Sequence, residues 1–256
     1  MKLMTWNVNS IRVREARLLR LLEAARPDVV CLQELKVVNE AFPFEALRDA
    51  GYHAAVHGQK TYNGVAILSR LEPEGVERGF GDDEDDEQAR LVAARIAGVH
   101  VASVYVPNGA EVGSEKWAYK LSWMKRLRHW LDRRFARPDL VALCGDFNVA
   151  PEARDVSDPD AWEGSVLTDP EARKALQDVR AFGLVDSFRL HHEEPGFYSW
   201  WDYRMLGFPR NKGLRIDHID LSGPLAERCT GASIERDERK GKQPSDHAPV
   251  IAELDL

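Results

Sequence analysis

Apolar residues along the chain follow two patterns, short continuous runs and longer stretches with a helical repeat. The short runs predict buried strands, because they are bounded by Gly, Pro or acidic residues that favour turns. They lie at residues 2–6, 29–32, 64–69, 91–96, 100–106, 140–143, 216–221 and 249–254. We therefore expect a protein rich in β-structure.

The helical repeat predicts three helices, at residues 14–25, 114–135 and 170–182. The longest begins at Ser114, whose hydroxyl suits a helix N-cap, and its apolar residues are spaced to share one face. Pro27, Pro138 and Gly183 follow the three predicted ends. Residues 150–170 are rich in Pro, Asp and Gly, and they predict a long loop of a kind that often carries function.

Strands mixed with long helices predict an α/β fold in which two packed mixed β-sheets are flanked by helices. The chain contains no Gly/Ser linker, low-complexity tract or strong repeat. We therefore expect one domain over residues 1–256. Residues 82–87 form an acidic run, which we interpret as a solvated loop between strands, because consecutive carboxylates without a glycine turn do not all face one ion.

Composition narrows the class of protein. The 256 residues are 44% apolar, and no stretch is apolar enough to span a membrane. There is no secretory signal pattern, and Cys31, Cys144 and Cys229 are scattered, so we expect free thiols in the reducing cytoplasm. The net charge of −7 argues against a protein that coats polyanions, but it allows a nucleic-acid enzyme with one basic face.

Polar residues recur where the predicted strands end. A single such residue is usually a turn or a helix cap. The number of such residues changes this interpretation. Strand ends can converge on one rim of a sheet, and carboxylates that converge there need a shared cation. The residues concerned are Asn7, Asn9, Glu34, Tyr105, Asp146, Asn148, Asp217, Asp246 and His247.

The types of these residues indicate phosphodiester hydrolysis. Glu34 offers hard oxygen ligands suited to Mg²⁺ or Mn²⁺, and Asn7 assists without adding charge. Neighbouring carboxylates favour the charged form of His247 near a phosphate. Asp146 is suited to align or deprotonate a water, and Asn148 to donate to a phosphoryl oxygen. The chain has no G-x-S-x-G or Walker sequence, so direct attack by water is the consistent mechanism.

Five segments resemble the signature blocks of the exonuclease III family of abasic-site endonucleases, in the family's order and across nearly the whole chain. They are residues 5–12 (TWNVNSIR), 32–36 (LQELK), 145–148 (GDFN), 213–217 (GLRID) and 245–247 (SDH). The resemblance implies a four-layered α/β sandwich, Mg²⁺ dependence with Mn²⁺ as a substitute, incision 5′ to abasic sites, and 3′→5′ exonuclease and 3′-end repair activities. It also implies that the protein is a monomer acting on duplex DNA with abasic sites or blocked 3′ ends.

The same resemblance implies individual roles. Glu34 would be the main metal ligand, Asp146 would activate or orient the attacking water, and Tyr105 would contact the phosphate or aid the leaving group. Asp217 would orient His247, which would bind the phosphate. Asn9 stands where some members carry Asp, which leaves open a second direct metal carboxylate. The residues expected near the metal are Asn7, Glu34, Asp146, Asn148, Asp246 and His247, and the catalytic set is Tyr105, Asp146, Asn148, Asp217 and His247.

Residues 198–204 (YSWWDYR) and 210–215 (RNKGLR) resemble the family's pocket for the abasic nucleotide. An aromatic wall suits a deoxyribose without a base, and flipping costs less where no base is stacked. We expect Trp200 and Leu214 to line this pocket and Trp201 to pack in the core. The other candidates for DNA contact are Asn108, Arg204, Arg210, Lys212, Arg239, Lys240 and Lys242.

Two other functions are compatible with this fold. Relatives include DNase I-like nucleases, inositol-phosphate phosphatases and sphingomyelinases, so another phosphodiesterase or phosphatase of the same superfamily is the first alternative. A catalytically inactive nucleic-acid-binding regulator is the second. Such regulators show erosion at catalytic positions, whereas every position named above holds a competent residue. We therefore favour an active nuclease.

Overall fold

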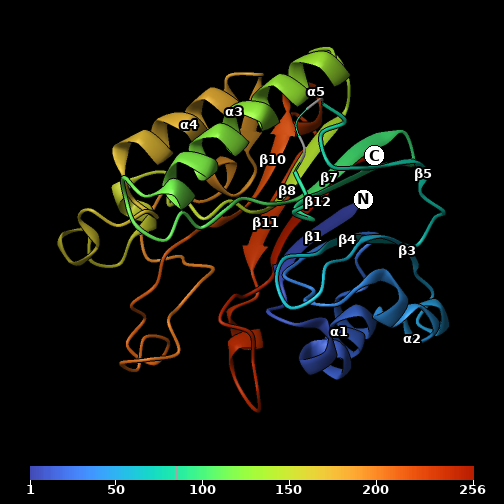
Figure 1. Cartoon of the computed structure of the whole chain (residues 1–256). Coiled ribbons are helices and arrows are strands. Elements are labelled where there is room, and N and C mark those ends of the chain that lie inside the picture. The colour runs from blue at the N-terminus through green and yellow to red at the C-terminus, as the bar shows by residue number, and fades with distance from the viewer. Residues whose placement is uncertain (83, 85) are drawn as a thin grey trace.

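Two β-sheets pack face to face at the centre of the computed structural model, which describes residues 1–82, 84 and 86–256. Figure 1 shows α1 (Ile11–Ala25) and α2 (Phe44–Asp49) on one side of the sheets, and α3 (Glu115–Arg134) and α4 (Pro170–Arg180) on the other. A short helix, α5 (Gly223–Ala226), lies near the end of α3. The predicted four-layered α/β sandwich is confirmed.

The first sheet has six strands in the order β11-β12-β1-β2-β4-β3. β1 and β2 run parallel, and all other neighbours are antiparallel. The strands are β1 (Lys2–Asn7), β2 (Val29–Gln33), β3 (His53–His57), β4 (Val65–Ser69), β11 (Cys229–Ile234) and β12 (Val250–Leu254).

The second sheet has six strands in the order β5-β6-β7-β8-β10-β9, with one parallel pair, β7 and β8. The strands are β5 (Glu74–Arg78), β6 (Leu91–Ile96), β7 (Val99–Tyr105), β8 (Val141–Asp146), β9 (Leu184–Asp186) and β10 (Asp217–Ser222). Each sheet therefore contains one helical crossover, β1–α1–β2 or β7–α3–β8, as a parallel pair requires. The carboxyl ends of these strands lie in register, because Asn7 pairs with Gln33 and Tyr105 pairs with Asp146.

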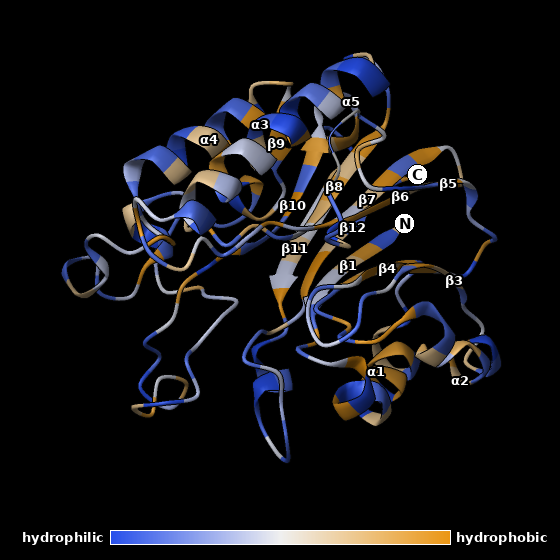
Figure 2. Cartoon of the chain, viewed as in Figure 1, coloured by the Kyte–Doolittle hydropathy of each residue, from blue (hydrophilic) through white to orange (hydrophobic). Residues whose placement is uncertain are grey.

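Side chains that alternate along a strand pack into two different hydrophobic cores. Val29 and Cys31 of β2 pack between the sheets, whereas Val30 and Leu32 pack beneath α1 and α2. A third apolar cluster fills the space between the second sheet and helices α3 and α4. In Figure 2 the buried strands carry much of the hydrophobic colour, and the helices carry hydrophobic and hydrophilic residues around their axes. Both faces of each sheet are therefore covered by packed layers.

The predicted elements agree with the structure except at ends and edges. α1 begins at Ile11 instead of residue 14, and β8 continues through Gly145 to Asp146, so Asp146 lies inside a strand and not after it. The four strands without a prediction, β3, β5, β9 and β11, are the four sheet edges. An edge strand is partly exposed or short, so it lacks the continuous apolar run that signals a buried strand.

Three smaller expectations also have an outcome. Cys31 and Cys144 are buried free thiols, as predicted, and Cys229 is half-buried. The acidic run lies between β5 and β6, with Asp83 and Asp85 outside the described residues. The expectation that the run is simply solvated is wrong for residues 82 and 86, whose carboxylates each lie 2.8 Å from the guanidinium of Arg126 on α3. Across residues 1–82, 84 and 86–256, no helix is long and apolar enough to cross a membrane.

Candidate active site

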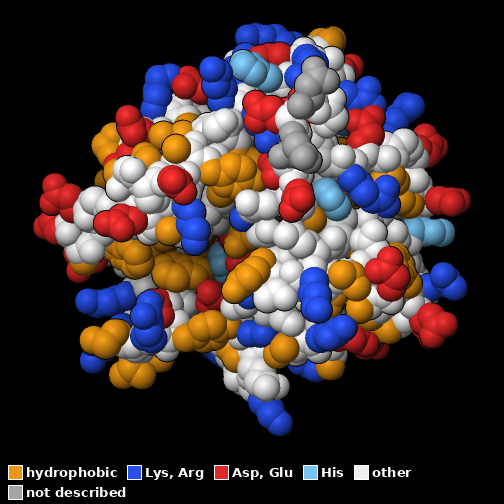
Figure 3. Space-filling model, in the orientation of Figure 1, with side chains coloured by type: hydrophobic (Ala, Val, Ile, Leu, Met, Phe, Trp, Pro, Cys, Tyr) orange, Lys and Arg blue, Asp and Glu red, His pale blue; other side chains and the backbone are white. Residues whose placement is uncertain are grey.

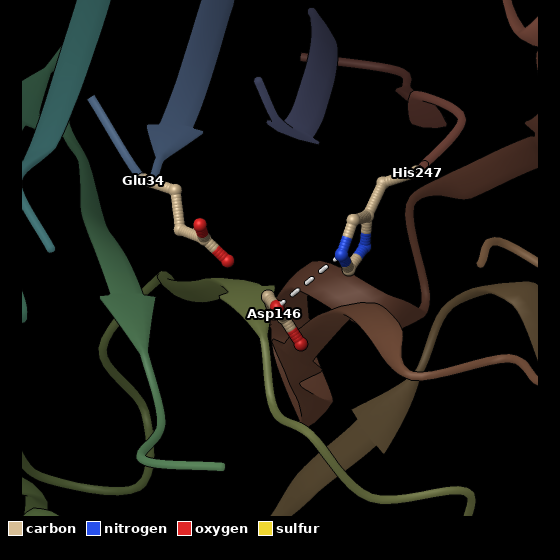
Figure 4. Close-up of side chains that lie close together, drawn as sticks. All are labelled: Glu34, Asp146 and His247. Atoms are coloured by element: carbon tan, nitrogen blue, oxygen red, sulfur yellow. Dashed lines mark ion pairs between the residues drawn. The ribbon is translucent and has the colours of Figure 1, made fainter. Parts of the chain in front are cut away.

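Strand ends bring the predicted polar residues together at one rim of the two sheets. Asn7 ends β1, Glu34 directly follows β2, and Asp146 ends β8. Asp217 begins β10 and pairs with Asp146 across the sheet, while His247 lies shortly before β12. Figure 4 shows the side chains of Glu34, Asp146 and His247 pointing toward one another. The two parallel crossovers and the antiparallel pairing of β10 with β8 therefore bring these residues together.

Unusual backbone conformations aim three of the residues at this rim. Glu34, Asn9 and Asn148 have φ values of 52°, 44° and 50°, in the left-handed region. Asparagine tolerates this region, whereas glutamate rarely adopts it. Neighbouring segments hold Glu34 in place, since its carbonyl accepts from the amide of Ser10 at 2.8 Å and the next amide, of Leu35, donates to Gly64 at 3.1 Å. Strain of this kind clusters at functional sites.

The amide of Asn7 links the two acidic side chains. Its Nδ2 donates to Oε1 of Glu34 and to Oδ2 of Asp146, both at 2.9 Å. The hydroxyl of Tyr105 also donates to Oε1 of Glu34 at 2.8 Å, and the ammonium of Lys36 lies 2.9 Å from Oε2. Burial raises the pKa of Glu34, but the charge of Lys36 and the hydrogen bonds from Asn7 and Lys36 outweigh it and lower the pKa. Glu34 is therefore held as a carboxylate.

Ligand atoms of Glu34, Asp146 and His247 all lie within 4.8 Å of one another. Burial raises the pKa of Asp146 to about 7, against the opposing effects of His247 and Asn7. A nearby cation would stabilise the ionised form of such a buried carboxylate. The carboxylate oxygens of Glu34 and Asp146 are the donor type preferred by hard divalent ions. The chemistry of the donor set therefore fits a metal ion between these two side chains.

His247 is held by a carboxylate on each side. Its Nδ1 lies 2.9 Å from Oδ2 of Asp217, and its Nε2 lies 3.8 Å from Oδ2 of Asp146, the contact drawn in Figure 4. Burial lowers the pKa of His247, but Asp217 and then Asp146 raise it to a net value of about 10. The hydroxyl of Ser199 donates to Oδ2 of Asp217 at 2.6 Å and accepts from the backbone amide of the same residue. The ring is therefore oriented and cationic at neutral pH.

Asn148 and Asn108 form a pair on the other side of Asp146. The backbone amide of Asn148 donates to Oδ1 of Asp146 at 2.9 Å, and its Nδ2 donates to the carbonyl of Val106 at 2.9 Å. Asn108, which is exposed, donates its Nδ2 to Oδ1 of Asn148 at 3.0 Å. Hydrogen bonds thus run from Asp146 through the buried Asn148 to the exposed Asn108.

Asp246 belongs to a separate set of contacts beside the acidic pair. Its Oδ1 accepts from Nδ2 of Asn9 and its Oδ2 accepts from Nε1 of Trp200, at 2.9 and 3.0 Å. Asn9 is joined in turn to Asn7, because its backbone amide donates to Oδ1 of Asn7 at 2.9 Å. Asp246 therefore sits one step from the group formed by Glu34, Asp146 and His247.

The two neighbouring tryptophans differ as predicted. Trp201 is fully buried in a small cluster with Tyr198, whereas Trp200 is half-buried and packs edge-to-face on Trp162 at 5.8 Å between ring centroids. Leu214 has no exposed surface, since it lies in the core and pairs with Trp200 through backbone hydrogen bonds. Of the two residues predicted to line a pocket, Trp200 is therefore partly accessible, whereas Leu214 is buried.

Most of the cations expected at DNA lie on two loops that project at the bottom of Figure 1, coloured orange and red. Figure 3 shows Lys and Arg side chains gathered on the same part of the surface, beside a hollow bordered by hydrophobic side chains. Arg204, Arg210 and Lys212 are exposed on the first loop, and Lys240 and Lys242 on the second. This placement leaves all five accessible to a polyanion.

The expectation for Arg239 is wrong. Its side chain is 5% exposed, and its guanidinium donates to the carbonyls of Ser245 and Trp201. It also lies over the rings of Tyr203 and Phe208, 5.2 Å from each centroid. A sequence cluster of cations does not reveal which member turns inward to bind backbone carbonyls.

Three residues that support the site were missed from the sequence. Ser199 braces Asp217, and Ser245 donates to the carbonyl of Asn7 at 2.7 Å. Lys120 is fully buried and donates to the carbonyl of Asn148 at 2.8 Å. Both serines lie inside segments that carry the family resemblance, but neither was given a role. Lys120 carries a signal as well, because it falls on the helix face that the apolar repeat of residues 114–135 marks as buried.

Comparison with known proteins agrees with this geometry. The Endonuclease/Exonuclease/phosphatase family matches residues 4–247. Exodeoxyribonuclease III of Haemophilus influenzae is 38% identical, over 99% of this chain and 100% of its own length. The DNA repair nuclease APEX1 of Danio rerio is 31% identical, over 98% of this chain and 81% of its own.

Two solved structures extend the likeness to three dimensions. An AP endonuclease from Archaeoglobus fulgidus superposes with a TM-score of 0.97 at 41% identity, and the 3′ phosphatase NExo from Neisseria, bound to a product DNA hairpin, with 0.98 at 42%. Both alignments cover 100% of each chain.

The chain therefore belongs to the endonuclease/exonuclease/phosphatase family of hydrolases. Within that family its relatives are exodeoxyribonucleases and AP endonucleases, so the assignment to the exonuclease III family made from the five sequence segments is confirmed. The expectation of a hydrolytic DNA-repair nuclease is confirmed with it.

Proposed function

We propose that the protein hydrolyses the phosphodiester 5′ to abasic sites in duplex DNA, and that it also removes blocking groups and nucleotides from 3′ ends. The observation that carries this proposal is the convergence of Glu34, Asp146 and the cationic His247 within 4.8 Å of one another. Two carboxylates for a metal and an imidazolium for a phosphate are what metal-assisted phosphodiester hydrolysis requires.

The cofactor that we propose is Mg²⁺, with Mn²⁺ able to replace it. The ligands available at the acidic pair are oxygens, and no thiolate is near them among the described residues, which favours a hard ion over zinc. When bound, the ion would supply positive charge for the scissile phosphate and for the departing oxygen. We propose Glu34 and Asp146 as its direct protein contacts. Asn7 points its amide nitrogen at both carboxylates, so it orients them.

The remaining residues would act on the water and the phosphate. Asp146, a buried carboxylate 3.8 Å from Nε2 of His247, would orient a water and accept its proton. His247 would hold a phosphoryl oxygen through its Nε2–H, while Asp217 keeps the ring charged and oriented. Asn148 and Asn108 would donate to the same phosphate. Tyr105, whose pKa burial raises well above its usual value, would remain a neutral hydroxyl and would turn its proton from Glu34 to the phosphate.

The substrate side is formed by Trp200 and the basic loops. Trp200 presents a half-buried ring whose Nε1 is held by Asp246, so the ring forms a fixed wall against which a base-free sugar fits. Arg204, Arg210 and Lys212 are exposed on the adjoining loop and would contact backbone phosphates. The Neisseria relative was solved with a DNA hairpin, which supports DNA as the ligand of this face.

Processing of 3′ ends is the second activity that a specific observation favours. The 42% identical neighbour from Neisseria is described as a 3′ phosphatase, and also as a 3′–5′ exonuclease. One metal-assisted site can serve both reactions, because each breaks a phosphorus–oxygen bond by attack of water. An inactive regulator is disfavoured, since the acidic pair and the Asp217–His247 pair are both intact.

We further propose that residues 1–256 act as one catalytic domain and as a monomer. Apolar residues from both sheets share the central cluster, and both sheets contribute residues to the site. Each residue given a role above comes from the same chain, so no second copy is needed to complete the site.

The test uses a 5′-labelled duplex with a single tetrahydrofuran abasic analogue, with and without Mg²⁺. A parallel undamaged duplex and one ending in a 3′-phosphate separate the three activities. We expect Mg²⁺-dependent incision 5′ to the analogue and release of the 3′-phosphate, both abolished by a chelator. Absence of incision at the analogue with rapid hydrolysis of an inositol phosphate would refute the repair assignment. Chelator-resistant incision would refute the metal.

A further inference from the structure

Lys120 lies inside the protein beneath the loops that carry Asn108 and Asn148. The residue is fully buried on α3, and its ammonium donates to three backbone carbonyls. The acceptors are Asn108 at 3.1 Å, Asn148 at 2.8 Å and Val166 at 2.6 Å. Asn108 follows β7, whereas Asn148 and Val166 lie near the two ends of the long segment between β8 and α4. A single side chain therefore joins the segment after β7 to both ends of the segment after β8.

Packing alone does not explain a lysine at this position. Its neighbours on the same helix face, Trp117 and Met124, are apolar and buried. In the described part of the chain Lys120 has no carboxylate within ion-pair distance, and burial lowers its pKa to about 7 against the more distant charges of Asp146 and Asp169, which raise it. A buried amine without a directly paired carboxylate is costly, so an apolar residue would be the less demanding choice for a helix that needs only to pack. The three carbonyl acceptors at hydrogen-bond distance account for an amine at this position.

The bonds from Lys120 act on the Asn108–Asn148 pair. Both residues are held by their backbone carbonyls, while their side chains are joined at 3.0 Å between Nδ2 of Asn108 and Oδ1 of Asn148. The next residue, Gly109, has a φ of +96°, and a Cβ there would lie 3.1 Å from Cδ of Lys120. The lysine stem therefore packs closely against Gly109, where a residue with a side chain would meet it.

From these contacts we propose that Lys120 is a positioning residue, whose buried ammonium fixes the separation and direction of the Asn108 and Asn148 amides at the scissile phosphate. The proposal rests on the proposed function, because it takes those amides as phosphate donors. Lys120 does not touch substrate, and it acts through the backbone of the two asparagines. Small displacements of such donors are costly to a reaction that depends on alignment.

The other half of the fold uses a cation in the same way. Arg14, on the first crossover helix α1, is 9% exposed and donates to the carbonyls of Asn9 and Pro244, both at 2.8 Å. Asn9 is the residue that binds Asp246. Each crossover helix thus sends one buried cation to the carbonyls of loops at the active rim, Arg14 on the Asp246 side and Lys120 on the Asn148 side.

The first test compares Lys120→Met with Lys125→Met, a matched change at an exposed lysine on the same helix. On the abasic duplex with saturating Mg²⁺, we expect Lys120→Met to lower kcat about 10- to 100-fold, with KM changed by less than about threefold, since the flanking phosphate contacts are intact. Lys120→Gln, which keeps one amide donor, should lie between. Unaltered kcat in folded Lys120→Met, with only Tm reduced, would assign the lysine to stability and overturn the proposal.

The second test asks whether Lys120 acts through the two asparagines. In an Asn108→Ala/Asn148→Ala background, adding Lys120→Met should lower kcat by less than about threefold, because both groups being positioned are already gone. Losses that multiply would overturn the proposal. A readout without catalysis distinguishes it from failure of the proposed function: the side-chain amide NMR signals of Asn108 and Asn148 should shift in Lys120→Met and not in Lys125→Met. Unmoved signals would overturn it even if the wild-type protein cuts DNA.

Discussion

Oδ2 of Asp217 lies 2.9 Å from Nδ1 of His247 and also accepts a 2.6 Å hydrogen bond from the hydroxyl of Ser199. Ser199 therefore fixes the orientation of the Asp217 carboxylate, and this carboxylate stabilises the protonated imidazole of His247. Burial alone would lower the pKa of His247, whereas Asp217 and Asp146 raise it to about 10. The other nitrogen, Nε2, faces Asp146 and the space where the phosphate is proposed to bind.

Asp217→Asn should reduce activity and change its pH dependence. Without the Asp217 charge, the pKa of His247 falls from about 10, so the ring loses its proton at lower pH. We expect kcat/KM to decline about 100-fold or more at pH 8 and to decline less at pH 6, where the ring is still charged. Full pH profiles of kcat/KM for both proteins measure this. The exposed Asp237→Asn is the matched control, and a uniform loss at all pH values would contradict the electrostatic role.

Glu34→Gln should raise the metal requirement more than it alters the fold. The substitution keeps the size of the side chain and leaves an oxygen for Tyr105 and Asn7, but it removes the charge. We expect the Mg²⁺ concentration for half-maximal activity to rise about tenfold or more. Activity titrations and calorimetric titration of Mn²⁺ without substrate provide two measurements. Glu40→Gln, at an exposed glutamate, is the control, and an unchanged Mg²⁺ requirement in Glu34→Gln would remove Glu34 from the ligand set.

The sequence predicts the central strands and the crossover helices well, because these elements bury continuous or periodic apolar faces. From that pattern, Asn7 and Asp146 are expected directly after strands, and in the structure they are the last residues of β1 and β8. The edge strands were missed because one exposed side interrupts the apolar run. β5 (EGVER) shows this clearly, since it carries three charged residues among five.

Contacts between distant segments were harder to predict than elements. The charge of Arg239 is visible in the sequence, but its direction depends on Trp201, Tyr203 and Phe208, which reach it only in the folded chain. Ser199 and Lys120 act on residues 18 and 28 positions away, at contacts that no local pattern encodes. Local propensity thus identified the strand-end residues, whereas the residues that orient them required the tertiary structure.

The adjacent tryptophans provide a test of substrate discrimination. Trp200→Ala removes a half-buried ring and its bond to Asp246, so it should weaken preference for the abasic duplex over undamaged DNA with a small loss of stability. Trp201→Ala empties a fully buried site and should destabilise the protein by about 3–5 kcal/mol. Urea unfolding and the ratio of incision rates separate the two effects. Equal loss of discrimination in both variants would contradict a pocket role specific to Trp200.

A buried charge network lies behind the site. Arg215 binds Asp155 and Asp186 at 2.7 Å, and Arg180 binds Asp220 at 2.8 Å. His218 lies among them, with its Nδ1 accepting from Arg215 and its Nε2 donating to the carbonyl of Val149, both at 3.0 Å. These contacts fix one neutral tautomer. Burial and the neighbouring guanidinium groups of Arg215 and Arg180 lower the pKa of His218 to about 3.

His218 should therefore make stability depend on mild acid. Its pKa is lower in the folded protein than the ordinary 6.5, so the unfolded chain takes up the proton first and stability falls as the pH drops below 6.5 toward 3. The slope from this residue is about 1.4 kcal/mol per pH unit. His218→Gln keeps an amide donor and acceptor but does not titrate. We expect it to be less stable than wild type at pH 7.5, and the gap to narrow by about 2 kcal/mol at pH 5. Other titrating groups contribute to both proteins and cancel in the difference between their urea unfolding free energies. A gap that is the same at both pH values would show that the pKa of His218 is not lowered by folding.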